Sequence, residues 1–166
     1  MGLTGTVDTS LTISTSKLQD VLGKKVLVVG GTSGLGRAIA LEAASRGATV
    51  KVVGRTFKDE GVGGLSFEKA DLSLMKEAKR IGGTVDDNFD VVVLTQGVIA
   101  ASKREESADG LEMDMAVSYL SRLVILQSLT PRLKKDARIF IMGFPGSAPS
   151  MYRIDDLNAE QSYNGM

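Results

Sequence analysis

The 166-residue sequence contains neither cysteine nor histidine, and these two absences exclude several kinds of site. Without cysteine the chain can form no disulfide, thiolate nucleophile or zinc–thiolate cluster. Without histidine it has no Ser-His-Asp triad and no imidazole to act as a general base or metal ligand. Any acid–base chemistry must therefore come from Tyr, Lys, Asp or Glu side chains, or from a bound cofactor.

An excess of charge of one sign and long apolar runs are also lacking. Twenty Lys and Arg residues balance twenty Asp and Glu residues, so the charge pattern does not favour a nucleic acid or an anionic membrane as partner. No apolar run reaches membrane-spanning length, and the first residues lack the features of a secretory signal. We therefore expect a cytoplasmic protein with a polar arm and short helix over 1–23 and one folded domain over 24–166.

From residue 24 onward, short Val-rich runs typical of buried strands alternate with segments of helical periodicity. Strands are expected at 24–31, 48–55, 65–70, 90–97 and 137–143, and helices at 34–47, 73–83 and 108–135. In the first helix, Leu35, Ile39 and Ala43 recur at helical spacing. The alternation predicts a three-layer α/β fold, a Rossmann-type doubly wound parallel sheet with right-handed crossovers.

The turn between the first strand and the first helix has the glycine pattern of a phosphate-binding loop. In VLVVGGTSGLGRAIA, Gly30, Gly34 and Gly36 permit a tight turn, close approach of a diphosphate and close packing of the helix. The exposed N–H groups and the helix dipole would face the phosphates, and Thr32 and Ser33 add hydroxyl donors. Its position directly after the first strand favours a nucleotide site over an ordinary turn.

The spacing G-x-x-x-G-x-G resembles the cofactor loop of the short-chain dehydrogenases/reductases (SDRs), with Val29 where that family usually has threonine. Asp71 and Leu72 correspond to the family position that contacts adenine. The segment 94–97, LTQG, corresponds to the family's N-N-A-G segment, of which only Gly97 is kept. The long helix and fifth strand also fit, so the resemblance extends from residue 24 to the end and implies the SDR cofactor-binding fold.

The resemblance implies an oxidoreductase that transfers a hydride between a nicotinamide cofactor and a small carbonyl or alcohol substrate. At the end of the second strand, Gly54 stands where NAD-binding proteins usually place an acidic residue, and Arg55 follows it. Because a guanidinium pairs well with a phosphate, NADP(H) is the preferred cofactor and NAD(H) the alternative. The expected cofactor-binding residues are Gly30, Thr32, Ser33, Gly34, Leu35, Gly36, Arg55, Asp71, Leu72, Gln96 and Gly97.

The catalytic positions implied by the resemblance are less well kept. Ser118 corresponds to the family asparagine that helps hold a proton-relay water. Gly143 and Phe144 stand in the two places of the family's catalytic serine, and neither side chain can hold a substrate carbonyl. Ser147 and Ser150 follow a few residues later, either as substitutes or as ordinary loop residues. No metal site is expected.

Tyr163 is the remaining catalytic candidate, after DDLNAEQS, a segment similar to the retinol-dehydrogenase-like branch of the family. It corresponds either to the catalytic tyrosine, which works with a lysine one helical turn later, or to a non-catalytic tyrosine of that branch. No such lysine follows in this chain, so we expect a pKa near the ordinary value of about 10 and weak or absent turnover. Tyr152 is excluded, because Asp156 would raise its pKa. A non-catalytic NADP(H)-binding module or a truncated product is the alternative.

The carboxyl-terminal part of the chain predicts unusual exposure. Complete family members continue with further strands, so the sheet is expected to be truncated after about strand five. The helix over 111–129 is apolar nearly all round, and such a helix needs a partner on two sides. The sequence therefore predicts a homodimer through this helix, or else an exposed apolar surface.

Overall fold

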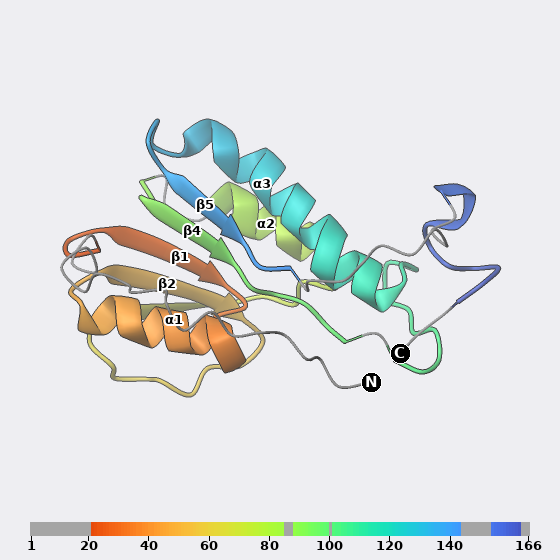
Figure 1. Cartoon of the computed structure of the whole chain (residues 1–166), viewed down its shortest axis with the longest axis horizontal. Coiled ribbons are helices and arrows are strands. Elements are labelled where there is room, and N and C mark those ends of the chain that lie inside the picture. Colours follow the sequence, from red (N-terminus) through yellow and green to blue (C-terminus); the bar gives the residue numbers. More distant parts are fainter. Residues whose placement is uncertain (1–20, 85–87, 100, 144–153, 164–166) are drawn as a thin grey trace, which may run out of the picture.

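The computed structural model describes residues 21–84, 88–99, 101–143 and 154–163 (Figure 1). These residues form one parallel sheet with the strand order β3-β2-β1-β4-β5. The strands are β1 (Lys25–Val29), β2 (Thr49–Gly54), β3 (Leu65–Lys69), β4 (Val91–Leu94) and β5 (Arg138–Ile141). The chain runs outward from β1 to β3, then returns to the other side of β1 for β4, which confirms the predicted doubly wound α/β sheet of Rossmann type.

Helices lie on both faces of the sheet, so the fold has three layers. Figure 1 shows α1 on one face and both α2 and α3 on the other. The helical elements are α1 (Gly34–Ser45), α2 (Met75–Thr84), the π-helical η2 (Met115–Leu120), α3 (Ser121–Leu129) and the 3₁₀ turns η3 (Thr130–Arg132) and η4 (Ile154–Asp156). None of the helices in the described ranges is long and apolar enough to cross a membrane.

The expected helix over 108–135 is shorter and less regular than its sequence suggests. Gly110 has φ +73, a left-handed conformation in a turn before the helix. Asp109 accepts a hydrogen bond from Met75 N at 2.7 Å, which satisfies a backbone donor at the start of α2. The element α3 begins at Ser121, after the π-helical η2, and Pro131 lies in the 3₁₀ turn that follows α3. The expectation of one continuous helix over 108–135 was therefore wrong at both ends.

Two apolar clusters lie on opposite faces of the sheet, because successive strand residues point to opposite sides. On the face of α2 and α3, Leu27 of β1 belongs to a cluster that includes Ile81 of α2 and Ile125 of α3. On the other face, Val28 of β1 belongs to a cluster that includes Ala40 of α1. The core therefore surrounds the central strands β1, β2 and β4, which fixes the strand ends around the candidate site.

The buried face of α1 carries small residues. Leu35 is 57% exposed, whereas Gly36, Ala40 and Ala43 face the sheet. The reason is the close approach of α1 to the strands. A side chain at position 36 would overlap the Thr95 hydroxyl and the Gly30 carbonyl, so small residues occupy this face.

The first described residues pack onto the domain. Gly23 N donates to Gly47 O at 2.9 Å, and Val21 packs against the cluster on the α1 face. Residues 1–20 of the predicted arm lie outside the described residues. The division into an arm over 1–23 and a domain over 24–166 therefore stays a prediction.

The apolar surface of the long helix is narrower than its composition suggests. Ile125 and Leu129 are buried against the sheet, while Leu123 is 46% and Tyr119 59% exposed. Val124 and Leu126 also pack partly against the core. On β5, at the edge of the described sheet, all four residues are exposed. The outward apolar surface therefore comprises only part of the helix and the β5 edge.

Candidate cofactor site at the strand ends

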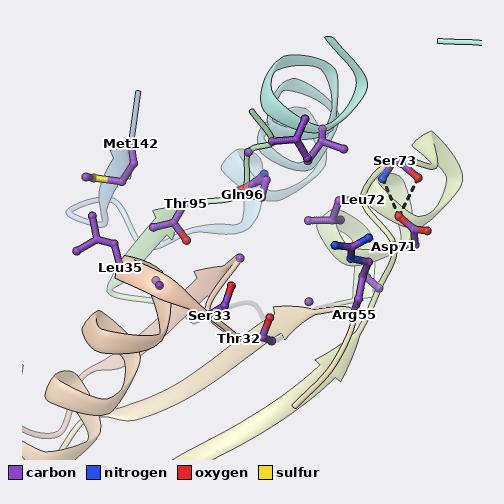
Figure 2. A pocket seen from close by; sticks show the side chains of 18 of the residues that line it. Thr32, Ser33, Leu35, Arg55, Asp71, Leu72, Ser73, Thr95, Gln96 and Met142 are labelled. Atoms are coloured by element: carbon purple, nitrogen blue, oxygen red, sulfur yellow. Dashed lines mark hydrogen bonds between the residues drawn. The ribbon is translucent and has the colours of Figure 1, made fainter. Parts of the chain in front are cut away.

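A cavity of about 450 Å³ lies beyond the carboxyl ends of the parallel strands (Figure 2). Its lining comes from the turn after β1, the ends of β2 and β3, the segments after β4 and β5, and the π-helical η2. All eleven sequence-predicted cofactor residues line it, namely Gly30, Thr32, Ser33, Gly34, Leu35, Gly36, Arg55, Asp71, Leu72, Gln96 and Gly97. The fold thus brings together residues from four separate strand ends, the usual ligand position in an open α/β sheet.

The glycine turn after β1 is tightly packed on one side and open on the other. Gly30 has φ +84, and a Cβ there would lie 2.5 Å from Gln96 N. At Gly36 a Cβ would lie 2.5 Å from Gly30 O. Gly34 has φ +51, but a Cβ there would meet nothing within 4 Å. Gly30 and Gly36 therefore allow close packing of strand and helix, and Gly34 leaves the cavity side open.

The amino terminus of α1 points backbone donors at this opening. Ser33 is the N-cap residue, but its side chain makes no capping hydrogen bond, and the first turn carries no acidic residue. The first N–H groups of a helix have no partner within the helix and lie at the positive end of its dipole. This end of α1 therefore suits an anionic group such as a diphosphate.

Thr95 joins the β4 end to the glycine turn, a role not evident in the sequence. Its backbone N donates to Val29 O at 2.8 Å, and its hydroxyl donates to the same oxygen at 3.0 Å. Gly30 N donates to Val53 O at 2.9 Å on the other side. Val29, in the family's threonine position, is fully buried. The turn is thus held by both neighbouring strands.

Arg37 and Arg55 differ in whether the charge of the side chain has a partner. Arg37 of α1 donates from Nε to both carboxylate oxygens of Asp59, at 2.9 and 3.1 Å. Asp59 is only 7% exposed, and its hydrogen bond with Arg37 lowers the pKa of its carboxyl. Arg55, directly after β2, is exposed and has no ion-pair or hydrogen-bond partner within the described ranges. Arg55, which lines the cavity, therefore offers a positive charge to a ligand.

The residues after β3 present a short polar turn beside a buried leucine. Asp71 is exposed, and its Oδ1 accepts hydrogen bonds from Ser73 N at 3.1 Å and from the Ser73 hydroxyl at 2.8 Å, as the dashed lines in Figure 2 show. Leu72 is buried and belongs to the core cluster of α2 and α3. The pair therefore combines a carboxylate at the cavity edge with an apolar anchor.

The segment after β4 is held by the long helix. Val98 N donates to the Ser118 hydroxyl at 3.2 Å, so the predicted relay residue contacts backbone. Ser118 does not line the cavity, although its neighbour Val117 does. Arg122 donates to Gln96 O and, at 2.7 Å, to Met142 O. Sequence reasoning missed Arg122; the available signal was a single charge within an apolar helical segment.

Tyr163 lines a smaller, adjoining hollow of about 210 Å³. Its hydroxyl donates to Ala101 O at 2.8 Å. Burial raises its pKa, and the charges of Glu112, Asp114 and Glu105 raise it further. The expectation of an unshifted pKa was therefore wrong, because burial and the charges of three carboxylates favour the protonated phenol.

Asn158 fixes the short segment that carries Tyr163. Its Oδ1 accepts from Glu112 N at 2.7 Å, and its backbone O accepts from Arg104 Nε at 3.0 Å. Its Nδ2 donates to Gly110 O at 3.1 Å. One side chain thus ties 154–163 to the loop before the long helix.

Some predicted positions cannot be placed. Phe144, Ser147, Ser150 and Tyr152 lie outside the described residues, whereas Gly143 is described and exposed. In the described part, no group of three or more His, Cys, Asp or Glu side chains is arranged to hold a metal ion.

A glycine-rich turn at the point where the strand order reverses defines a Rossmann-type dinucleotide-binding unit. No family model matches the chain. It is 44% identical over 147 residues to an uncharacterized oxidoreductase of Saccharomyces cerevisiae, covering 82% of this chain and 47% of that protein. It is 30% identical over 156 residues to dehydrogenase/reductase SDR family member 12 of Bos taurus, covering 86% and 49%. Retinol dehydrogenase 14 of Homo sapiens is 28% identical over 171 residues, covering 86% and 51%.

Solved structures with a similar fold include members of the same family. A protein from Mycobacterium paratuberculosis superposes with a TM-score of 0.75 at 24% identity, covering 87% of this chain and 55% of that one, and shows the fold alone. RhlG of Pseudomonas aeruginosa, solved with NADP, superposes with a TM-score of 0.57 at 26% identity, covering 71% of this chain and 53% of that one. An NADH-dependent reductase solved with NAD superposes with a TM-score of 0.56 at 24% identity, covering 69% of this chain and 53% of that one. The chain belongs to the short-chain dehydrogenase/reductase family, and spans about half the length of the curated relatives it matches.

Proposed function

We propose that this chain is the cofactor-binding part of an NADP(H)-dependent oxidoreductase that acts on a small carbonyl or alcohol. The observation that carries the cofactor choice is Arg55, a cation at the end of β2 that lines the cavity and has no partner within the described ranges. When bound, the nicotinamide would supply or accept the hydride. The substrate class is proposed from the family.

The residues present fit a dinucleotide. The turn at Gly30 and Gly36 has no room for a Cβ, while Gly34 faces open space, as needed where a backbone meets a diphosphate. The uncapped amino end of α1 would hold the diphosphate through its N–H groups. Arg55 would pair with the 2′-phosphate, and Asp71 and Leu72 would contact the adenine. Gln96 and Gly97 would flank the nucleotide on the β4 side.

Replacing Arg55 with alanine is expected to weaken NADPH binding by about 1.5 to 3 kcal/mol, the range for a hydrogen bond to a charged group. NADH binding should barely change, because NADH has no 2′-phosphate. Parallel fluorescence titrations with both cofactors measure the difference. Lys58→Ala is the matched control, since it removes a positive charge from the same loop but from a residue that does not line the cavity. Equal weakening of NADPH and NADH by Arg55→Ala would assign Arg55 a structural role only.

A second candidate function is a non-catalytic NADP(H)-binding module. Two hydrogen bonds favour it, because they engage both predicted catalytic hydroxyls with backbone. The Ser118 hydroxyl accepts from Val98 N, and the Tyr163 hydroxyl donates to Ala101 O. A raised pKa also makes the Tyr163 phenol a poorer base at neutral pH.

We therefore expect this chain to bind NADPH but to oxidise it slowly, or not at all, with aldehydes, ketones or quinones. Because its phenol is protonated at neutral pH, Tyr163 gives little base catalysis, and Tyr163→Phe should leave any residual rate unchanged. Absorbance at the NADPH band measures turnover. Ser162→Ala, a change at the residue before Tyr163, serves as the control. Rapid turnover that Tyr163→Phe abolishes would make Tyr163 the catalytic acid or base and remove the second candidate.

We also propose that the chain forms a homodimer through the exposed part of η2 and α3, which lie within the helix predicted over 111–129. Tyr119 and Leu123 remain exposed there, and burying such side chains against a second copy is favourable. Light scattering over a concentration series should show association that Leu123→Glu abolishes. Gln127→Glu, an exposed change on the same helix, is the control. A monomer at all concentrations would argue against this interface.

A further inference from the structure

Two polar groups with an unfavourable contribution to stability lie at the cavity wall that the segment after β4 forms. The first is Gln96 Oε1, which is buried and has no hydrogen-bond partner in the described part of the chain. Turning the carboxamide over does not remove this cost. Gln96 Nε2 donates to the Ser121 hydroxyl at 3.3 Å, and that hydroxyl gives its own proton to Val117 O at 2.7 Å. Ser121 thus has no proton left for an oxygen in the Nε2 position, so one polar atom stays unpaired in either orientation.

The second cost is the guanidinium of Arg122. Its hydrogen bonds go to backbone carbonyls, and it forms no ion pair within the described ranges. Burial lowers its pKa, with only a partial opposing effect from the charge of Asp114. A partly buried cation without a carboxylate partner loses some hydration, and hydrogen bonds to carbonyls compensate for this loss less fully than an ion pair would. Both unfavourable groups involve Gln96, in the short segment after β4.

Arg122 links two strand ends beyond the last hydrogen bond of the sheet. Met142 N donates to Leu94 O at 2.9 Å at the end of the β4–β5 pairing. Past this point the guanidinium donates from Nη1 to Met142 O and from Nε to Gln96 O, at 2.7 and 3.2 Å. Gln96 and Met142 both line the cavity (Figure 2). Arg122 therefore fixes the spacing of the two cavity walls on the β4 and β5 side.

This side is opposite the adenosine half. In a Rossmann-type site the diphosphate lies at the turn after β1, with the adenosine ribose beside the end of β2. The nicotinamide half then lies toward β4 and β5. Polar groups that oppose stability are typical of functional sites, where ligand geometry determines the arrangement of side chains.

We propose that Arg122 is a positioning residue for the nicotinamide half of the cofactor, acting through the carbonyls of Gln96 and Met142. The inference rests on the proposed binding of a nicotinamide dinucleotide. Arg122 does not line the cavity and needs no contact with the ligand. Its role is to hold two strand ends that do.

Arg122→Met, which keeps an apolar stem and removes the donors, provides the test. Two ligands are titrated by fluorescence: NADPH, and adenosine 2′,5′-bisphosphate, which lacks the nicotinamide half. The melting temperature without ligand is recorded for each variant. We expect Arg122→Met to weaken NADPH about tenfold, the loss of roughly one charged hydrogen bond, and to leave the bisphosphate unchanged. Arg122→Lys should give a smaller loss of the same kind, because one ammonium cannot reproduce the planar fork.

Arg132→Met is the matched control. Arg132 follows the same helix and also donates to backbone carbonyls, those of Ser128 and Gly82, away from the cavity. It should lower the melting temperature without changing either affinity. If Arg122→Met behaves like this control, or weakens both ligands equally, the positioning role is wrong. If Arg122→Met does not fold, Arg122→Lys decides by the same two titrations. A wild type that binds neither ligand would overturn the proposed function itself.

Discussion

Replacing Gly36 with alanine is expected to lower the free energy of unfolding by about 2 to 3 kcal/mol. The added Cβ would lie 2.5 Å from Gly30 O and would overlap the Thr95 hydroxyl. Backbone cannot yield as a flexible side chain does, so α1 must move away from the strand ends, and overpacking of this kind costs about 1 to 3 kcal/mol. Urea unfolding monitored by circular dichroism measures the change.

Gly83→Ala is the matched control for this substitution. Gly83 lies in α2, and a Cβ there would meet nothing within 4 Å. Alanine is favoured over glycine within helices, so this variant should gain up to about 1 kcal/mol. The two variants should therefore change stability in opposite directions. If Gly36→Ala also gains stability, α1 does not approach β1 and β4 as closely as described.

Replacing Gly34 with leucine is expected to abolish cofactor binding in a chain that still folds. A side chain at this position would meet no protein atom within 4 Å and would project into the open side of the cavity. It would thus occupy the space proposed for the diphosphate. Because a ligand that binds only the folded state stabilises it, NADPH at a hundred times its Kd should stabilise the wild type by about 2.7 kcal/mol. For Gly34→Leu that stabilisation should vanish.

The control must carry the same backbone cost, because Gly34 has φ +51. Gly61 has φ +83, lies in the loop between β2 and β3, and also has nothing within 4 Å of a Cβ. In Gly61→Leu the left-handed conformation should cost about 1 to 2 kcal/mol, while the rise in melting temperature with NADPH is kept. Thermal scans with and without NADPH compare the variants. An equal rise in Gly34→Leu and wild type would place the cofactor elsewhere.

The sequence predicted the fold well because its signals are local. Val-rich runs such as 26–29 indicate strands buried on both faces, and the observed β1 covers Lys25–Val29. The observed strand order, with β4 beside β1, is the doubly wound arrangement that the alternation of strands and helices predicts. The glycine turn was equally readable, since Gly30 and Gly34 adopt positive φ, which glycine tolerates best.

Helix boundaries and buried faces were less predictable. In α1 the close contact at Gly36 requires small residues on the buried face, and Leu35 is exposed at the cavity. The composition of 111–129 suggested an apolar helix on all sides, but packing of Val124 and Leu126 covers part of it. In both cases the distance between a helix and its neighbours decided the outcome, and sequence spacing does not contain that distance.

By itself, the sequence determined the order of strands and helices, the cofactor turn and the family resemblance. Each depends on residues close together in the chain. Only the tertiary structure decided which polar groups meet. Arg37 pairs with Asp59, which lies 22 residues away in the sequence. Arg122 donates to the carbonyl of Gln96, 26 residues away, and the Tyr163 hydroxyl donates to the carbonyl of Ala101, 62 residues away. Such partners are chosen when the strand ends assemble, because a hydrogen bond requires an approach within about 3 Å that no local pattern specifies.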